Sequence, residues 1–255
     1  MPLFDKSAIK SDFSRAAKGS YEKSAELQKE TAHKLFLMVK EEIKPKSRVL
    51  DLGSGTGFIA KNGNKIWNMV QIDITSAMCN ISSSFAPAVN ADMEFMPFKN
   101  NSFDCVISSL AIQWANDIKK VMGEANRVLR NEGKLFFTTF GKDTLKELDS
   151  TLTNFGYNGH ISNFSEIENI RKLMKKSGFK DIICDTEKIS MSYPDLLTLM
   201  KKIKNVGGGN KLVTRKKTLN KETLKRASEY YKSKFPSDGG IKASWQIIYV
   251  SGVKT

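Results

Sequence analysis

The sequence has few residues able to hold a metal ion or form a disulfide, since its 255 residues include only 3 Cys and 2 His. Cys79, Cys105 and Cys184 are far apart and lie within or beside apolar runs, so we expect buried, reduced thiols. No apolar run approaches the roughly 18 residues that a membrane span needs, and residues 1–6 lack the apolar core of a signal peptide. These absences predict a cytoplasmic protein without a metal centre or a membrane partner.

Acidic residues are also scarce: 41 Lys and Arg stand against 27 Asp and Glu, which leaves a net charge of +14. Lysine predominates among the basic residues, a bias that whole genomes can impose. The excess is nevertheless dense in residues 201–234, where 12 Lys and Arg accompany only Glu222 and Glu229. Such a segment attracts acidic partners by electrostatic steering. The candidate partners are a nucleic acid, a membrane surface and an acidic protein. A nucleic acid is disfavoured because the segment has no interleaved aromatic platform and no RNA-binding module accompanies it.

The most informative segment is the glycine-rich loop at residues 50–57, which reads Leu-Asp-Leu-Gly-Ser-Gly-Thr-Gly. It follows an apolar run typical of a buried strand and precedes a segment suited to start a helix. Glycines at alternate positions permit a tight turn and let the backbone approach a ligand closely. Taken alone, such a turn can also be a plain connection between a strand and a helix.

Two carboxylates downstream of the loop favour a nucleoside ligand. Asp73 ends the next apolar run, and at the tip of a parallel strand it can accept both ribose hydroxyls. Asp92 is placed to accept an adenine amino group, with Met93 packing on the ring. The Gly-x-Gly-x-Gly spacing, in place of Gly-x-Gly-x-x-Gly, shifts the interpretation from a dinucleotide to S-adenosylmethionine. In these features the chain resembles the class I methyltransferases.

Apolar runs alternate with helical stripes from residue 47 onward, which predicts βαβ units and a parallel arrangement. Strands are expected at 47–52, 68–73, 87–91, 103–109, 133–140, 179–189 and 241–250. We therefore predict an α/β, Rossmann-like fold with a seven-stranded, mainly parallel sheet flanked by helices. The expected organisation is an N-terminal helical lid (1–45), a cofactor-binding core (46–192), an inserted basic helical cap (193–234) and a final core strand (235–255).

Helical patterns define the lid and the cap. Residues 6–42 have apolar residues at helical spacing, with a break expected at Gly19-Ser20. In the cap, an apolar stripe over residues 196–203 is typical of core packing and is also compatible with a substrate groove. A basic helix is expected at 220–233.

Three segments far apart in the sequence form a more specific pattern. They are Phe13-Ser14-Arg15-Ala16-Ala17 with Tyr21 and Leu27-Gln28, then Leu110-Ala111-Ile112-Gln113-Trp114, and Thr144-Leu145-Lys146-Glu147-Leu148. In these segments the chain resembles the malonyl-acyl-carrier-protein O-methyltransferases of biotin synthesis over nearly its whole length. The resemblance implies methyl transfer from S-adenosylmethionine to the free carboxylate of malonyl, carried by acyl carrier protein or by CoA, as an early step towards the pimeloyl moiety of biotin.

The C-terminal half carries a second resemblance. Gly159-His160-Ile161-Ser162, Asp185-Thr186-Glu187-Lys188-Ile189 and Tyr193-Pro194 are similar to the methyltransferase-like assembly factors of respiratory complex I. That resemblance implies an alternative in which the protein acts on an arginine of a partner protein as a hydroxylase. Methylation of another small carboxylic acid is a further alternative.

The methyltransferase resemblance assigns roles to individual residues. The cofactor-binding residues would be Gln28, Asp51, Gly53, Ser54, Gly55, Gly57, Asp73, Ile74, Asp92, Met93, Ser108 and Ser109. Tyr21 would close over the cofactor and substrate, although it can also be a helix-packing aromatic. Gln113 would shape the acyl pocket, together with Trp114 unless that residue belongs to the core.

A malonyl carboxylate also needs a cation to orient it, and arginine does so bidentately. Arg215, which lies in the cap, is the first choice, ahead of Lys201 and Lys204. The basic cap at 201–234 would also dock the acidic carrier protein.

Overall fold

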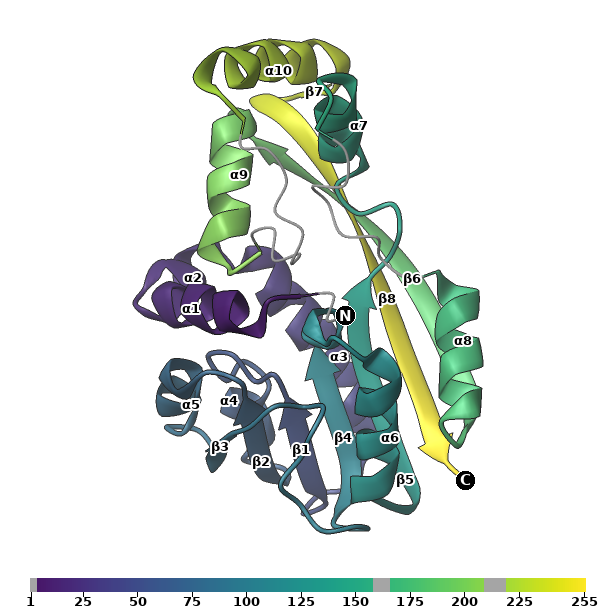
Figure 1. The fold of residues 1–255 in the computed structure, drawn as a ribbon. Helices are drawn as coiled ribbons and strands as arrows, with labels where there is room; N and C mark the ends of the chain where they lie inside the picture. Colours follow the sequence, from purple (N-terminus) through teal and green to yellow (C-terminus); the bar gives the residue numbers. More distant parts are fainter. Residues whose placement is uncertain (1–3, 158–165, 209–218) are drawn as a thin grey trace.

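The computed structural model describes residues 4–157, 166–208 and 219–255, which are built around one sheet (Figure 1). In sheet order its strands are β3 (Ala88–Asn90), β2 (Asn68–Asp73), β1 (Arg48–Leu52), β4 (Phe103–Ser109), β5 (Leu129–Phe140), β8 (Gly240–Lys254) and β6 (Phe179–Tyr193). The two-residue β7 (Pro236–Ser237) pairs with β8.

The first five strands are parallel, and β8 and β6 are antiparallel additions at one side. Strand β1 lies between β2 and β4, so the chain winds outward from β1 in both directions. In open α/β sheets, ligands bind at the carboxyl ends of the strands beside such a reversal. The predicted Rossmann-like fold with a mainly parallel sheet is confirmed, and the glycine-rich loop follows the central strand.

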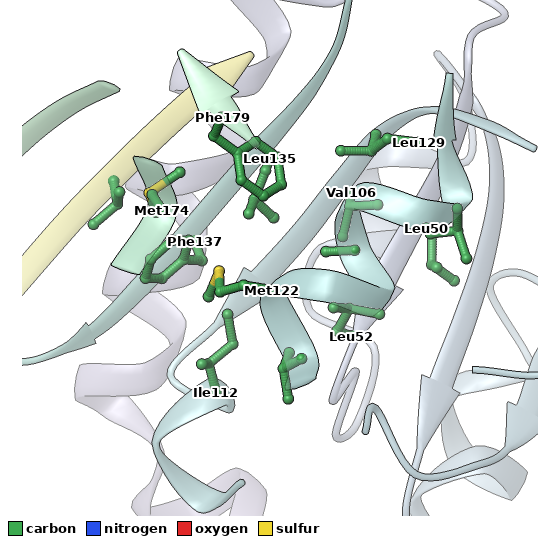
Figure 2. Close-up of a cluster of buried hydrophobic side chains, with 14 of the residues drawn as sticks. Leu50, Leu52, Val106, Ile112, Met122, Leu129, Leu135, Phe137, Met174 and Phe179 are labelled. Atoms are coloured by element: carbon green, nitrogen blue, oxygen red, sulfur yellow. The ribbon is translucent and has the colours of Figure 1, made fainter. Parts of the chain in front are cut away.

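Helices cover both faces of the parallel strands and bury separate apolar clusters. On one face, α6 (Ile118–Val128) and α8 (Ile167–Lys176) pack on β1, β4 and β5, with Met122, Phe137 and Met174 among the contacts (Figure 2). On the other face, α3 (Glu26–Glu42) and α4 (Ala60–Gly63) pack through Leu35 and Phe36. Burial of these side chains is the main stabilising contribution. Helix α5 (Ser76–Ser82), also in the core region, contacts β2 and β3.

The N-terminal region consists of three helices. The predicted break is present: α1 (Lys6–Ala17) ends before Gly19, whose φ of 117° begins α2 (Ser20–Ser24). A second interruption at Ala25, which the sequence did not indicate, separates α2 from α3. Helices α1 and α2 lie across the carboxyl ends of the parallel strands, between those strands and α9 (Leu196–Asn205) (Figure 1).

A third apolar cluster builds the cap from α9, α10 (Lys221–Lys234), α7 (Lys146–Asn154) and the far halves of β6 and β8. Leu196 and Leu199 of the apolar stripe are buried here, as core packing requires. Both long strands exceed their predicted lengths because of their mutual pairing: β6 continues to Tyr193, which pairs with Ile241, and β8 continues to Lys254, which pairs with Phe179. Within the part of the chain that the structure describes, no helix has the length and apolar character needed to cross a bilayer.

Candidate functional site

A pocket lies at the carboxyl ends of β1, β2 and β4, roofed by the N-terminal helices. Its walls come from four parts of the chain. The lining residues are Lys6, Ile9, Phe13 and Tyr21 from the lid; Gly53 and Gly55 from the loop; Ile72, Asp73, Ile74, Ala91, Asp92 and Met93 after β2 and β3; and Ser109, Leu110, Ala111, Trp114 and Ala115 after β4. The sequence places these segments up to about a hundred residues apart, and the sheet topology brings them together.

The glycine loop forms the floor of this pocket. Gly53 and Gly55 have φ values of 70° and 54°, a region that side chains with a Cβ adopt reluctantly. A Cβ on Gly53 would also collide with the Cβ of Ala111. The loop therefore needs glycine for its backbone conformation and for the open space above it.

The other loop residues are structural. The Gly53 and Ser54 N–H groups both donate to the Ile72 carbonyl, at 2.8 and 3.0 Å. Ser54 itself is buried beside Ser82, with 3.4 Å between the two hydroxyl oxygens. A Cβ on Gly57 would lie 2.9 Å from the Phe85 ring. Ser54 and Gly57 thus fix the loop against α5, and neither lines the described pocket.

Asp73 is held in place by three hydrogen bonds at the tip of β2. Its Oδ2 accepts the Gly55 N–H at 3.0 Å, and its Oδ1 accepts the N–H and hydroxyl of Thr75 at 2.9 and 3.0 Å. Burial raises the pKa of Asp73 despite these bonds. The carboxylate is therefore rigid and links β2 to the glycine loop.

Asp51, at the end of β1, adds a second buried carboxyl group. Burial, with a further contribution from the charge of Asp73, raises the pKa of Asp51 to about 7. Two carboxyl groups that repel each other in a closed site favour a cationic ligand, which relieves both the burial and the repulsion. The sulfonium and ammonium groups of S-adenosylmethionine have that charge.

The opposite end of the pocket is formed by the turn after β3. Asp92 and Met93 line it as predicted, and Asp92 Oδ1 accepts the Glu94 N–H at 3.0 Å. The ammonium of Lys6 pairs with Asp92 and also with Glu94, whose Oε1 lies 2.6 Å from Nζ. This ion pair joins the start of α1 to the turn after β3.

The lid places Tyr21 in the pocket. Its hydroxyl lies 3.6 Å from the position that a Cβ on Gly55 would take, and its ring stacks on Phe58 with centroids 6.2 Å apart. Burial first, and then the neighbouring Asp73 and Glu22 charges, raise the pKa of Tyr21, so its hydroxyl stays protonated. Tyr21 is thus both a packing aromatic and a polar group of the site. Gln28 lies half-buried on α3 and is not among the described lining residues.

The end of β4 divides its residues between the pocket and the sheet. Ser109 lines the pocket, whereas the Ser108 hydroxyl is buried and donates to the Leu52 carbonyl at 2.9 Å. In η1 (Ile112–Trp114), Gln113 donates through Nε2 to the Leu110 carbonyl at 2.8 Å and does not line the pocket. Trp114, the other residue proposed for the acyl pocket, does line the cavity.

Residues that the sequence did not suggest include Lys6, Ile9 and Phe13 of α1. Ile9 and Phe13 are one helical turn apart and both line the pocket. Their spacing predicts an apolar helix face, but it does not predict which part of the molecule that face covers. Nothing local to Lys6 predicts its partners, which are more than eighty residues away. Arg215 lies outside the described residues. No cluster of three or more His, Cys, Asp or Glu suited to a metal ion occurs in the described ranges.

The described residues fit S-adenosylmethionine. The glycine loop, which excludes any Cβ at Gly53, suits the methionine portion of the cofactor. The fixed carboxylate of Asp73 suits the ribose. The apolar and acidic end of the pocket, at Met93 and Asp92, suits the adenine. The carboxyl pair at the loop suits the positive charge of the cofactor.

Comparison with known proteins places these features in a family. The methyltransferase domain family matches residues 50–137. The chain is 32% identical to a malonyl-[acyl-carrier protein] O-methyltransferase of Gallionella capsiferriformans over 97% of this chain and 90% of the relative. It is 36% identical to the human mitochondrial arginine-hydroxylase NDUFAF5 over 80% of this chain, but it spans only 63% of that protein.

Solved structures agree on the fold. The YcgJ protein of Bacillus subtilis superimposes with a TM-score of 0.63 at 19% identity, covering 87% of this chain and 98% of that protein. A Haemonchus contortus phosphoethanolamine N-methyltransferase in complex with S-adenosyl-L-methionine gives a TM-score of 0.54 at 18% identity over 87% of this chain and 52% of that one. The chain belongs to the class I S-adenosylmethionine-dependent methyltransferases, in the group that includes the malonyl-[acyl-carrier protein] O-methyltransferases.

Proposed function

We propose that this protein methylates the free carboxylate of a malonyl thioester, carried by acyl carrier protein or CoA, as an early step in making the pimeloyl moiety of biotin. The observation that carries this proposal is the extent of the similarity. The match to the Gallionella enzyme covers 97% of this chain and 90% of the enzyme, and so takes in the lid and the cap as well as the fold's core. The lid and cap are the parts that would recognise an acceptor.

The bound cofactor would supply an electrophilic methyl group. A carboxylate acceptor is already a nucleophile, so the reaction needs no general base, and the chain's task is to align the acceptor and exclude water. Helices α1 and α2 cover the pocket and perform the second task. Gly53 and Gly55 would contact the methionine portion of the cofactor, Asp73 the ribose, and Asp92 and Met93 the adenine.

Tyr21 is proposed to orient the acceptor. Because its hydroxyl stays protonated at neutral pH, it can donate a hydrogen bond to a carboxylate oxygen beside the glycine loop. The Glu22 carboxylate next to it accepts the Thr56 hydroxyl at 2.5 Å, which ties α2 to that loop. Gln113 and Arg215 remain candidates for contact with the acyl group.

The outer surface of the cap is proposed to dock the carrier protein. The exposed basic side chains of the described part of the cap are Lys201, Lys204, Lys221, Lys225, Arg226, Lys232 and Lys234. Acyl carrier proteins are strongly acidic, so complementary charge would steer encounter and set the orientation. In the view of Figure 1 the cap helices α9 and α10 lie above the lid helices α1 and α2.

A second candidate is action on a protein arginine, as the name of the human relative states for that protein. The 36% identity to NDUFAF5 favours it. A basic cap gives no reason to bind an arginine substrate, which is itself cationic, and the match leaves more than a third of that relative's length uncovered. Methylation of a free small carboxylic acid stays a further alternative.

Intact-mass spectrometry of malonyl-acyl carrier protein, incubated with the protein and S-adenosylmethionine, tests the proposal. Acetyl-acyl carrier protein is the control because it lacks the free carboxylate, and calorimetry verifies separately that cofactor binds. We expect the mass of one methyl group on the malonyl form alone. No gain by a protein that binds cofactor would reject malonyl methylation and direct the search to a protein arginine.

A further inference from the structure

The start of α1 is fastened to the adenine end of the pocket by one lysine. Lys6 is the one cationic side chain among the described residues that line the pocket. Its ammonium contacts the Asp92 carboxylate and lies 2.6 Å from Glu94 Oε1, and its side chain is 25% exposed. Burial opposes the charge of Lys6, but the bonds to Asp92 and Glu94 outweigh it and raise its pKa. The ammonium is therefore held in a fixed, charged position.

Asn116, which follows η1 and is bonded to Glu94, holds the chain just before α1. The Phe4 N–H donates to Asn116 Oδ1 at 2.6 Å, and Asn116 Nδ2 donates to the Phe4 carbonyl at 3.2 Å. The Asn116 N–H in turn donates to Glu94 Oε1 at 2.7 Å. Glu94, which is only 5% exposed, thus binds both the Lys6 ammonium and the Asn116 N–H. A change at Glu94 would loosen both of these contacts.

Aromatic packing completes the attachment. The Trp114 ring lies between Phe4 and Phe13, with centroid separations of 5.8 and 5.7 Å. Phe13 and Trp114 both line the pocket, so this packing forms part of the cavity wall. Segment 4–13, which we call the clasp, is therefore fixed by a polar contact at one end and an aromatic contact along its length.

The position of Lys6 also controls the Asp92 carboxylate. An ionised carboxylate has about four acceptor sites. At Asp92, Lys6 occupies one of these sites, and the Glu94 N–H takes another on Oδ1 at 3.0 Å. The remaining sites are free to accept an amino group in the pocket, with the carboxylate plane fixed by its two donors.

We propose that Lys6 is a positioning residue for the cofactor, which orients Asp92 and locks the clasp across the adenine end of the pocket. A cofactor bound beneath the clasp leaves only after the contacts of Lys6 and Asn116 open. Loss of the Lys6 ammonium should accordingly speed dissociation more than it slows association. The proposal rests on cofactor binding by this family and is independent of which acceptor is methylated.

The test is stopped-flow measurement of S-adenosylhomocysteine association and dissociation for three single variants. Lys6→Met removes the charge and retains the stem, Lys6→Arg retains the charge, and Lys10→Met makes the same change at an exposed position on α1. Because charge-assisted hydrogen bonds are among the stronger ones, we expect Lys6→Met to raise the dissociation rate about tenfold. Lys6→Arg should stay within about threefold of the parent, and Lys10→Met should match it.

Glu94→Gln provides an independent route to the same contact. It keeps an acceptor for the Asn116 N–H but removes the charge that faces Lys6, and Glu94 does not line the pocket. Dissociation should again quicken, and the Lys6→Met/Glu94→Gln double variant should show less than the product of the two single effects. Thermal unfolding without ligand identifies any variant that does not fold. A parental dissociation rate in folded Lys6→Met, or an increase that Lys10→Met reproduces, would overturn the proposal.

Discussion

Charge is distributed in opposite senses over the pocket and the cap. The pocket and its surroundings contain the carboxyl groups of Asp51, Asp73, Asp92 and Glu94, and Lys6 is the one cationic side chain among the described lining residues. On the outer cap, α10 exposes five Lys and Arg side chains against Glu222 and Glu229. A protein of net charge +14 has therefore kept an acidic interior site. Acidic walls suit a cationic cofactor and a basic exterior suits an acidic partner, so each region can be disturbed separately.

The strongest way to break the pocket alone is Gly53→Ala. The added Cβ meets Ala111 and forces a residue with a side chain to hold a φ of 70°. We expect S-adenosylhomocysteine affinity to fall about a hundredfold, since both the loop and the space above it change. Isothermal titration calorimetry measures this directly.

The matched control is Gly123→Ala, on α6, where a Cβ has no neighbour within 4 Å. Alanine favours a helix over glycine by about 1 kcal/mol, so this variant should be at least as stable as the parent and bind normally. Parental affinity in Gly53→Ala would show that the loop does not contact the cofactor.

The next prediction concerns the ionisation of Asp51 beside the pocket. Asp51 has a folded-state pKa of about 7, raised by burial and by Asp73, against an ordinary value near ~3.9. The protonated form is therefore favoured by folding, and this contribution is present at low pH and is lost as pH rises through about 7. Without cofactor, the parent should lose on the order of 2 kcal/mol of stability between about pH 5 and pH 8 from this group.

Asp51→Asn should flatten that decline in Tm, leaving the part contributed by Asp73, whose pKa is also raised. Affinity for the cationic cofactor should increase with pH in the parent, because ionised Asp51 attracts it, and much less in the variant. The exposed Asp238→Asn serves as control. An equal slope of Tm with pH in parent and Asp51→Asn would refute the raised pKa.

The two regions also differ in how far the sequence predicts them. The glycine loop, Asp73, Asp92 and Met93 each follow a strand, and parallel strands bring their carboxyl ends to one edge, so local pattern was enough. The partners of Lys6 were missed because an ion pair across 86 residues leaves no local signal. Ser108 and Ser109 show a finer limit: neighbours in a strand point to opposite faces, and only the observed register tells which one meets the pocket.

The cap is less predictable because its strands stabilise each other. The lengths of β6 and β8 come from their mutual pairing, which runs from Phe179 opposite Lys254 to Tyr193 opposite Ile241 and joins residues that are distant in the sequence. Strand β5 likewise starts at Leu129, before the predicted residue 133, since Leu129 pairs with Phe103 across a bulge in which Glu132 has a φ of 60°. The cap helix α9, by contrast, was predictable from its apolar stripe.

Breaking the cap alone requires charge reversal on α10. Lys225→Glu combined with Lys232→Glu alters exposed positions far from the pocket lining. We expect the KM for malonyl-acyl carrier protein to rise about fivefold and its dependence on salt to weaken, with S-adenosylhomocysteine affinity unchanged. Steady-state kinetics at several ionic strengths provides the readout.

The control for net charge is a double variant that replaces Lys65, which is exposed on the core, and Lys44, at the end of the N-terminal helices, with Glu. This pair changes net charge equally but should leave the carrier KM within about twofold, because steering depends on where the charge lies. If both double variants raise KM alike, net charge and not the cap surface attracts the carrier.

The smallest effect concerns the contact that joins the two regions. Asn205, the last residue of α9, donates through Nδ2 to the Ser24 hydroxyl at 3.2 Å, and its carbonyl accepts the Ser20 hydroxyl at 3.3 Å. Asn205→Ala removes only the first bond, worth about 1 kcal/mol, so amide hydrogen exchange in α2 should quicken about fivefold. Ser233→Ala, which removes a bond within α10, is the control.

Cofactor should slow exchange in α2 of the parent, because α2 places Tyr21 over the glycine loop. In Asn205→Ala the slowing should persist in α2 but reach α9 less, since the bond from Asn205 Nδ2 to the Ser24 hydroxyl is missing. Equal protection of α9 in parent and variant would mean that lid and cap respond to cofactor independently. The acidic pocket and the basic cap would then be two adjacent binding surfaces without a shared conformational step.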